Sequence, residues 1–109
     1  MSETPARARR PLSGPTGQRV VAHRGELREV LHRHDVTNPE IFGSTARGDD
    51  HEDSDVDIVV DFPPGTSIID IIGIQHELEE ILGVHVDLIP RSGFKKRVSA
   101  RALKDLIAL

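Results

Sequence analysis

The feature that most constrains the fold is the run DVDIVVDF at residues 55–62. Its apolar residues are mostly β-branched and a Pro-Pro-Gly sequence follows it, a combination that predicts a β-strand. Side chains alternate between the two faces of a strand, so Val56 and Ile58 point together into a core. Asp55 and Asp57 then share the opposite face. A sheet built around this strand must therefore carry carboxylates on one face.

The remaining elements follow from apolar spacing and from residues that begin or end helices. Ser67 with Asp70 forms a capping-box pattern, and Gly83 stands where a helix commonly stops. Together these signals predict an α/β fold, with a small mixed β-sheet of three or four strands and helices packed mainly on one face. The expected elements are a helix over residues 18–34, a short strand at 41–42, a helical turn at 44–49, the strand at 55–62, a helix between residues 67 and 83, a strand at 84–89 and a helix over 92–109.

The chain of 109 residues has the length of one domain. Residues 1–17 are rich in Pro, Gly, Ser and Arg, which predicts a flexible basic tail before a domain at residues 18–109. The absence of Cys excludes disulfides and thiolate metal sites. No apolar run approaches the roughly 20 residues of a membrane-spanning helix, and no signal peptide is evident. We therefore expect a cytoplasmic protein without a membrane partner.

Charge is distributed unevenly along the chain. Residues 35–64 hold nine acidic residues and a single basic one, Arg47. Such an acidic segment repels nucleic acid unless cations screen it, and the chain has no Tyr or Trp for base stacking. The acidic segment therefore disfavours nucleic acid as a partner and favours a metal ion or a basic surface. The acidic residues from Asp49 to Asp53 are expected to be solvated charges of a loop.

Three features converge on one kind of chemistry. Gly43 and Ser44 directly follow a predicted strand, where the backbone can approach a ligand closely and hold phosphate oxygens. Asp55 and Asp57 lie on one face, and two carboxylates so close repel each other unless a cation lies between them. Asp87 lies on another strand, with its side chain also directed away from the core. If the two strands are neighbours, three carboxylates meet in a geometry suited to two Mg²⁺ ions.

The segment GSTARGDDHEDSDVDI resembles the signature of the polymerase-β-type nucleotidyltransferase superfamily, in which Gly-Ser precedes Asp-x-Asp. The ten-residue spacer from Thr45 to Ser54 is similar to that of the minimal nucleotidyltransferase (MNT) proteins of MNT/HEPN pairs. The sequence VHVDLI supplies the third Asp that this family places on the following strand. The resemblance covers roughly residues 19–109 and implies the polymerase-β-like nucleotidyltransferase fold.

The resemblance also implies roles for individual residues. It places Asp55, Asp57 and Asp87 as catalytic ligands of two Mg²⁺ ions, with Asp87 also helping to deprotonate the acceptor hydroxyl. Gly43 and Ser44 would hold the phosphates of ATP, and Arg47 would approach them or brace the loop. In the family, AMP is transferred from ATP to a Tyr hydroxyl of a partner HEPN toxin, a ribonuclease-like helical protein, which is thereby neutralised.

Several alternatives remain open from the sequence. The chain could be a non-catalytic antitoxin that acts by binding alone, or a nucleotidyltransferase that modifies RNA ends. Arg47 could form a salt bridge to the neighbouring acidic residues. Asp61 shares the carboxylate face but lies further along the strand, where we expect it to be solvated. His85 shares the face of Asp87 and is a further candidate for contact with the site.

Overall fold

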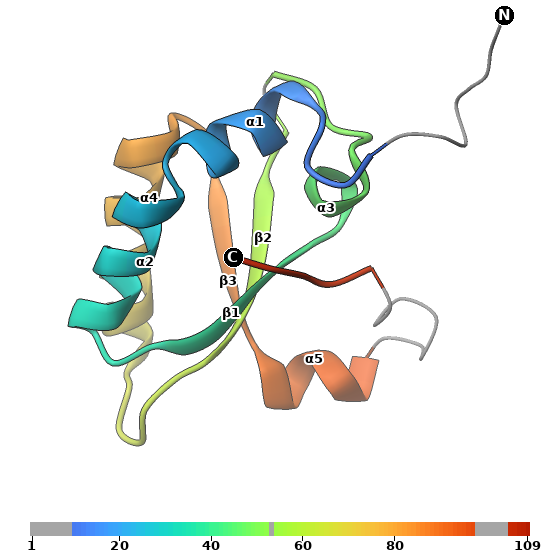
Figure 1. Ribbon diagram of the computed structural model, residues 1–109. Coiled ribbons are helices and arrows are strands. Elements are labelled where there is room, and N and C mark those ends of the chain that lie inside the picture. Colours follow the sequence, from blue (N-terminus) through green and yellow to red (C-terminus); the bar gives the residue numbers. More distant parts are fainter. Residues whose placement is uncertain (1–9, 53, 98–104) are drawn as a thin grey trace, which may run out of the picture.

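The computed structural model describes residues 10–52, 54–97 and 105–109, which form a four-stranded sheet with helices around it (Figure 1). None of the helices in these residues is long and apolar enough to cross a membrane. The elements in chain order are α1 (Pro15–Ala22), α2 (Arg24–Arg33), β1 (Thr37–Phe42), α3 (Ser44–Arg47), β2 (Val56–Asp61), α4 (Ile68–Leu82), β3 (Val86–Pro90), α5 (Arg91–Arg97) and β4 (Ile107–Ala108).

The sheet has the strand order β3-β2-β1-β4 and is mixed. β1 pairs antiparallel with both β2 and β4, whereas β2 and β3 are parallel and joined through α4. Parallel neighbours need such a crossover, because a tight turn reverses the chain direction. The strand that the sequence marks most clearly, β2, therefore lies inside the sheet with the neighbours β1 and β3.

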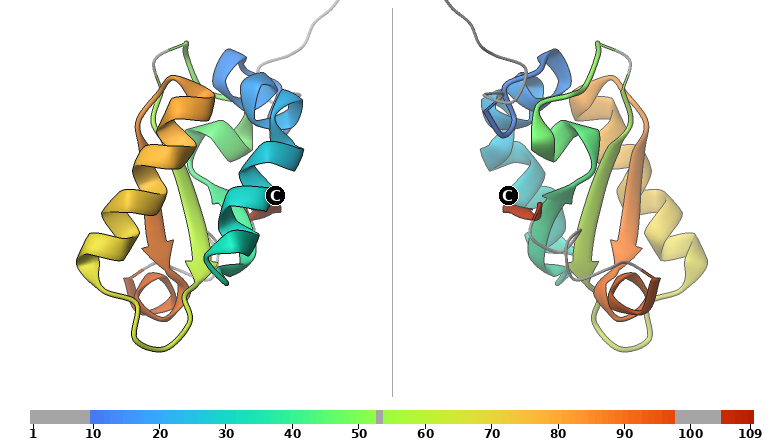
Figure 2. Two further views of the ribbon diagram at one scale, coloured as in Figure 1. Left: turned by 90° about the vertical axis from the view of Figure 1, so that its left-hand side faces the viewer. Right: turned by 90° about the vertical axis from the view of Figure 1, so that its right-hand side faces the viewer.

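Helices α2 and α4 cover one face of the sheet (Figure 2). The alternating residues Val56, Ile58 and Val60 of β2 are fully buried in the core between this face and the helices. On α4, the buried residues Ile74 and Leu78 are four apart, the spacing that brings side chains to one face of a helix. Burial of these apolar side chains, at about 25 cal/mol per Å², is the main contribution that holds the helices to the sheet.

Helix α4 begins and ends at the residues that the sequence predicts. Ser67 accepts a hydrogen bond from the Asp70 backbone N–H at 3.1 Å, and the Asp70 carboxylate accepts one from the Ser67 N–H at 3.0 Å. Gly83 ends the helix at a φ of 75°, a left-handed conformation that favours glycine. Ile68 and Ile69 in its first turn are 72% and 80% exposed, so the apolar pattern extends beyond the buried face.

The opposite face of the sheet is covered differently. Within the described residues, α5 packs at one end of this face, and the short helix α3, which follows β1, lies at the other end (Figure 2, right). Arg91, only 14% exposed, ties the start of α5 to the sheet by contacting Glu40 at 2.5 Å and Asp61 at 3.4 Å. Asp61 also accepts a hydrogen bond from Asn38 at 2.9 Å. The side chain of Asp61 is 41% exposed, as the sequence analysis expects, and it also helps to hold α5.

The amino-terminal part of the domain differs from the sequence expectation. The predicted helix over residues 18–34 is two helices, with the non-helical His23 between them. Both helices face the same core, so the apolar spacing continues across the break and does not reveal it. Residues 10–17 fall within the predicted tail, yet Leu12 and Thr16 are buried and α1 begins at Pro15. Residues 1–9 of that tail lie outside the described residues.

Asp50 explains why the chain before residue 18 is packed. Its carboxylate accepts hydrogen bonds from the backbone N–H groups of Thr16 at 2.7 Å and Gly17 at 3.0 Å, in the first turn of α1. These groups have no partner within the helix, and a carboxylate is favourable at this end of a helix dipole. Asp50 is 8% exposed, so the expectation of a solvated loop charge is wrong for this residue.

We expect Asp50→Ala to lower the free energy of unfolding by about 2 kcal/mol, because two helix-terminal N–H groups lose their acceptor. Urea unfolding followed by circular dichroism measures this change. Glu52→Ala is the matched control, since Glu52 is an exposed acidic residue of the same loop. Equal stabilities of the two variants would contradict the capping role of Asp50.

The carboxy-terminal part also differs from the expectation. A helix begins at Arg91, close to the predicted start at Ser92, but Ile107 and Ala108 form β4 and not the end of that helix. β4 pairs with β1, and the Leu109 N–H donates to the Pro39 carbonyl at 2.9 Å. The free edge of β1 offers these backbone bonds, which a helical apolar spacing cannot indicate. Residues 98–104 of the predicted helix lie outside the described residues.

Candidate active site

The sheet brings two of the predicted aspartates together. Asp57 of β2 is the register partner of Asp87 of β3 and of Phe42 of β1. Directly opposite residues of neighbouring strands place their side chains on the same face. Phe42 packs edge-to-face on Phe94 of α5, with ring centroids 4.7 Å apart. The two carboxylates therefore lie in one row of the sheet, which continues into an apolar contact beneath α5.

Asp55 lies at the entrance to β2 and is exposed. The Val56 N–H after it donates to the His85 carbonyl at 2.9 Å, so the chain is already aligned with β3 at this point. The Asp55 carbonyl accepts a hydrogen bond from the hydroxyl of Thr45 at 3.2 Å. Thr45 is fully buried and fixes the turn after β1 against the start of β2. The sequence analysis assigned no role to Thr45, because only the pairing of β1 with β2 shows it.

Gly43 and Ser44 form the turn between β1 and α3. Gly43 has a φ of 82° and a ψ of −154°, a conformation that is essentially restricted to glycine. A Cβ at this position would lie 3.0 Å from Oδ2 of Asp57. The backbone of the Gly-Ser turn thus approaches the carboxylate row closely, as the sequence predicts for a backbone that holds a ligand.

The electrostatics of the row reflect its crowding. Burial raises the pKa of Asp57 above its ordinary value, and the negative charges of Asp87 and Asp55 raise it further. A hydrogen bond between the carboxyl groups of Asp57 and Asp87 acts in the same direction, whereas the charge of His85 lowers this pKa. Carboxylates that resist simultaneous ionisation are stabilised when a cation lies between them.

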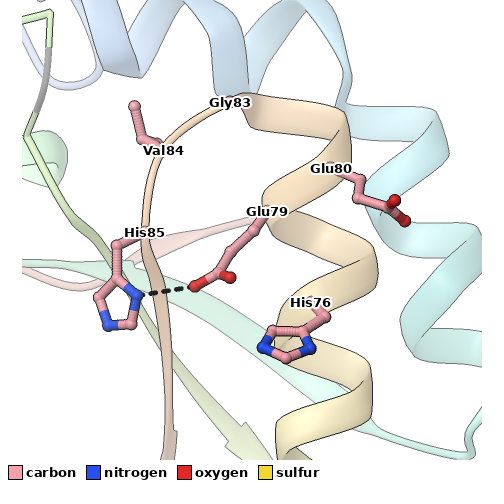
Figure 3. Close-up of a pocket in the computed structure, with 6 residues that line it drawn as sticks. All are labelled: His76, Glu79, Glu80, Gly83, Val84 and His85. Atoms are coloured by element: carbon pink, nitrogen blue, oxygen red, sulfur yellow. Dashed lines mark ion pairs between the residues drawn. The ribbon is translucent and has the colours of Figure 1, made fainter.

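His85 lies between two carboxylates. Its Nε2 is 2.9 Å from Oδ1 of Asp87, and its Nδ1 is 2.7 Å from Oε2 of Glu79 on α4. Burial lowers the pKa of His85, but the hydrogen bond and charge of Asp87 and the charge of Glu79 outweigh it and raise that pKa. Only the imidazolium form can donate from both ring nitrogens at once. Figure 3 shows the contact with Glu79.

A concavity of about 670 Å³ opens beside this contact. Two elements form it, the last turns of α4 and the segment that leads into β3 (Figure 3). Its lining residues are His76, Glu79, Glu80, Gly83, Val84 and His85. Since His85 also contacts Asp87, the concavity adjoins the carboxylate row. Glu79 and Glu80 in its lining add negative charge near Asp87.

Oxygen donors are the ligands that Mg²⁺ prefers, and the row offers them. Within the described residues, no three His, Asp or Glu side chains converge as a complete metal site. The protein atoms available are those of the neighbouring Asp57 and Asp87, with Asp55 two residues before Asp57. Mg²⁺ usually keeps several water ligands and binds substrate phosphates through one or two carboxylates. The donor set therefore fits a magnesium ion that arrives with a phosphate ligand.

Arg47 does not face the row through any contact that the structure shows. Its Nε lies 3.2 Å from Oδ2 of Asp49, and both side chains are exposed. This is the salt bridge that the sequence analysis left open as an alternative. A surface pair of this kind contributes less than about 1 kcal/mol, so it does not prevent Arg47 from turning toward a ligand.

The sequence matches the nucleotidyltransferase domain family over residues 24–109. The protein adenylyltransferase MntA of Thermococcus cleftensis is 40% identical over 88 residues, which cover 81% of this chain and 86% of that protein. A Methanocaldococcus jannaschii protein described as a protein adenylyltransferase is 37% identical over 78 residues, covering 72% of this chain and 84% of that protein.

Two solved structures share the fold. One, described as a minimal nucleotidyltransferase, has a TM-score of 0.69 and 32% identity, covering 84% of this chain and 94% of that chain. The other is a crystal structure of a toxin–antitoxin with AMP-PNP, with a TM-score of 0.55 and 23% identity, covering 69% of this chain and 59% of that chain. At this lower identity the second structure shows the fold alone. The predicted small mixed sheet of the nucleotidyltransferase type is confirmed.

Proposed function

The chain belongs to the nucleotidyltransferase domain family, and on that premise we propose that this enzyme is an antitoxin that transfers AMP from ATP to a tyrosine hydroxyl of a HEPN-type toxin. The observation that carries the proposal is the register of Asp57 with Asp87, next to the close approach of Gly43. The protein adenylyltransferase relative at 40% identity supports a protein acceptor. AMP on the tyrosine would neutralise the toxin.

Each site residue that the sequence predicts has a role in this proposal. Asp55 and Asp57 would hold two Mg²⁺ ions, which would neutralise the charge of the ATP phosphates and of the leaving group. Asp87 would complete one metal site and would accept the proton of the tyrosine hydroxyl. Gly43 and Ser44 hold phosphate oxygens, and Arg47 turns toward them.

The reaction balances without a further reactant. The tyrosine oxygen attacks the α-phosphorus of ATP and forms a new P–O bond. The bond from that phosphorus to the β-phosphate oxygen breaks, and pyrophosphate leaves with the electron pair. The proton of the hydroxyl passes to the carboxylate of Asp87, and catalysis consists mainly of positioning and charge stabilisation.

The solvent exposure of Asp87 and Asp55 supports a macromolecular acceptor. Asp87 is 48% exposed and Asp55 lies at the surface, so a tyrosine on another protein can reach both. A small domain cannot enclose a large substrate, and this one presents its carboxylates on a sheet face that α5 covers at one end.

The proposal is tested by incubating the protein with α-labelled ATP and Mg²⁺ together with either the product of the neighbouring gene or total tRNA. We expect label on the protein partner, at a tyrosine, and no label without Mg²⁺. Label on tRNA would instead support the modification of RNA ends. Tight binding of the partner without any transfer would contradict catalysis and support an antitoxin that acts by binding.

A further inference from the structure

We propose that His85 is a positioning residue that fixes the carboxylate of Asp87, and that Glu79 anchors it in this role. The inference rests on the proposed function, because it concerns how the carboxylate row receives the metal and nucleotide. It gives a role to His85 and Glu79, which lie outside the Gly-Ser and Asp-x-Asp segments. The evidence is the unbroken set of contacts from α4 through His85 to Asp87.

Glu79 is a firm anchor because the backbone holds it. Its Oε2 accepts a hydrogen bond from the Val86 N–H at 3.0 Å and lies 2.7 Å from Nδ1 of His85. Two residues further along β3, the Leu88 N–H donates a hydrogen bond to Gln75, one turn earlier in α4, at 3.0 Å. Both N–H groups belong to β3, an edge strand of the sheet. Side chains of α4 therefore satisfy the outer edge of β3 and fix its position relative to the helix.

This anchoring orients the imidazole of His85 at both ends. One ring nitrogen faces Glu79, and the other faces Oδ1 of Asp87 at 2.9 Å. A ring held through two nitrogens cannot rotate without breaking a contact. Figure 3 shows His85 directed toward Glu79 from the segment that leads into β3.

The consequence for Asp87 is a defined rotamer. Asp87 is half-exposed and adjoins the like charge of Asp57, so without a partner its carboxylate would turn away into solvent. Contact with His85 engages Oδ1 and holds the carboxylate of Asp87 beside that of Asp57, where the proposed metal would bind. Partners that orient a ligating carboxylate in this way typically contribute 10–100-fold to metal affinity or activity, as order-of-magnitude values.

A competing effect has the opposite sign. A cationic imidazole next to Asp87 repels a divalent cation, and on that ground alone its removal would strengthen metal binding. The two effects are distinguished by the direction in which the metal requirement changes when His85 is replaced. Positioning predicts weaker metal binding after the replacement.

The test measures binding without turnover. Thermal unfolding is followed at a fixed saturating concentration of a non-hydrolysable ATP analogue while Mg²⁺ is varied. We expect His85→Ala to need about 10-fold more Mg²⁺ for half-maximal stabilisation than the wild type. His85→Gln is expected to recover most of the difference, because the Gln amide can donate to Asp87 from nearly the same place. His76→Ala is the matched control, a histidine of the same concavity without a hydrogen bond to the described residues.

Each outcome decides for or against the inference. A His85→Ala variant with the wild-type Mg²⁺ requirement, or a lower one, would overturn it. A His85→Gln variant as defective as His85→Ala would also overturn it, because donation to Asp87 would then not be the cause. A wild type that Mg²⁺ and the analogue do not stabilise would contradict the proposed metal site itself, and this inference would fall with it. The wild-type response thus separates the two failures.

Discussion

Replacing Asp57 with Asn is expected to reduce AMP transfer by at least about 100-fold. Removal of a residue that only orients a metal ligand typically costs about 10- to 100-fold, and removal of the ligand itself should cost at least as much. Asp57 lies between β1 and β3 in the sheet, in register with Asp87 and 3.0 Å from the Cβ position of Gly43. Its carboxylate adjoins both the Gly-Ser turn and Asp87. The amide of Asn keeps the shape and removes the charge that a magnesium ion requires.

The matched control is Asp61→Asn on the same strand and the same face. Asp61 contacts Asn38 and Arg91 at the end of the sheet where α5 packs, away from the Gly-Ser turn. We expect its replacement to lower stability modestly and to leave transfer within a few-fold of the wild type. The measurement is the initial rate of label transfer from α-labelled ATP. A transfer rate of Asp57→Asn close to that of Asp61→Asn would contradict the metal role of Asp57.

Asp57→Asn is also expected to stabilise the metal-free protein. Burial and neighbouring carboxylates raise the pKa of Asp57 above the ordinary value of 3.8. The folded state therefore holds this proton more tightly than the unfolded chain. The resulting stability is fully present below pH 3.8 and is lost as the pH rises through the raised pKa. At pH 7 in the absence of divalent ions, Asp57→Asn should unfold at a higher temperature than the wild type, with a smaller difference at pH 3.

Local signals in the sequence predict the central part of this fold well. β2 follows from β-branched residues that alternate with carboxylates, and the limits of α4 follow from Ser67, Asp70 and Gly83. These signals depend on residues within a few positions of one another, so they can be read without knowing the rest of the structure. The convergence of Asp57 with Asp87 needed one further assumption, that their strands are neighbours, and the parallel pairing confirms it.

The features that the sequence did not reveal depend on distant partners. Asp50 is separated by more than thirty residues from the helix that it caps, and nothing in its own neighbourhood distinguishes it from solvated loop charges. Arg91 holds α5 through partners on β1 and β2, again far away in the chain. Such contacts are set by how elements pack. A charged residue in a polar segment carries no periodic signal of its partner.

Glu79 and His85 show the same limit near the site. Glu79 lies on a helix where acidic residues usually face solvent, and only the packing of α4 against the edge of β3 turns it toward His85. The sequence does indicate that His85 shares a face with Asp87, because the residues are two apart on a strand. It cannot indicate that a carboxylate of α4 anchors the ring on its other side.

Gly43→Ala is expected to reduce transfer by about 10- to 100-fold, because small displacements of reacting groups have effects of this size. The added Cβ would lie 3.0 Å from Oδ2 of Asp57, and Ala at a φ of 82° also strains the turn. The Asp57 side chain can move more easily than the backbone, so we expect its carboxylate to shift by a few tenths of an ångström. The backbone of the Gly-Ser turn would shift as well, and both sides of the proposed phosphate site would change together.

Gly65→Ala separates the two causes of that loss. Gly65 has a φ of 87°, close to that of Gly43, but an added Cβ would meet no atom within 4 Å. Both variants should lose about 1 kcal/mol or more of stability from the positive φ. Only Gly43→Ala should lose transfer, since only its Cβ reaches the carboxylate row. Urea unfolding and initial transfer rates of the two variants test this difference. Equal activity of both would mean that the close approach of Gly43 to Asp57 has no part in the reaction.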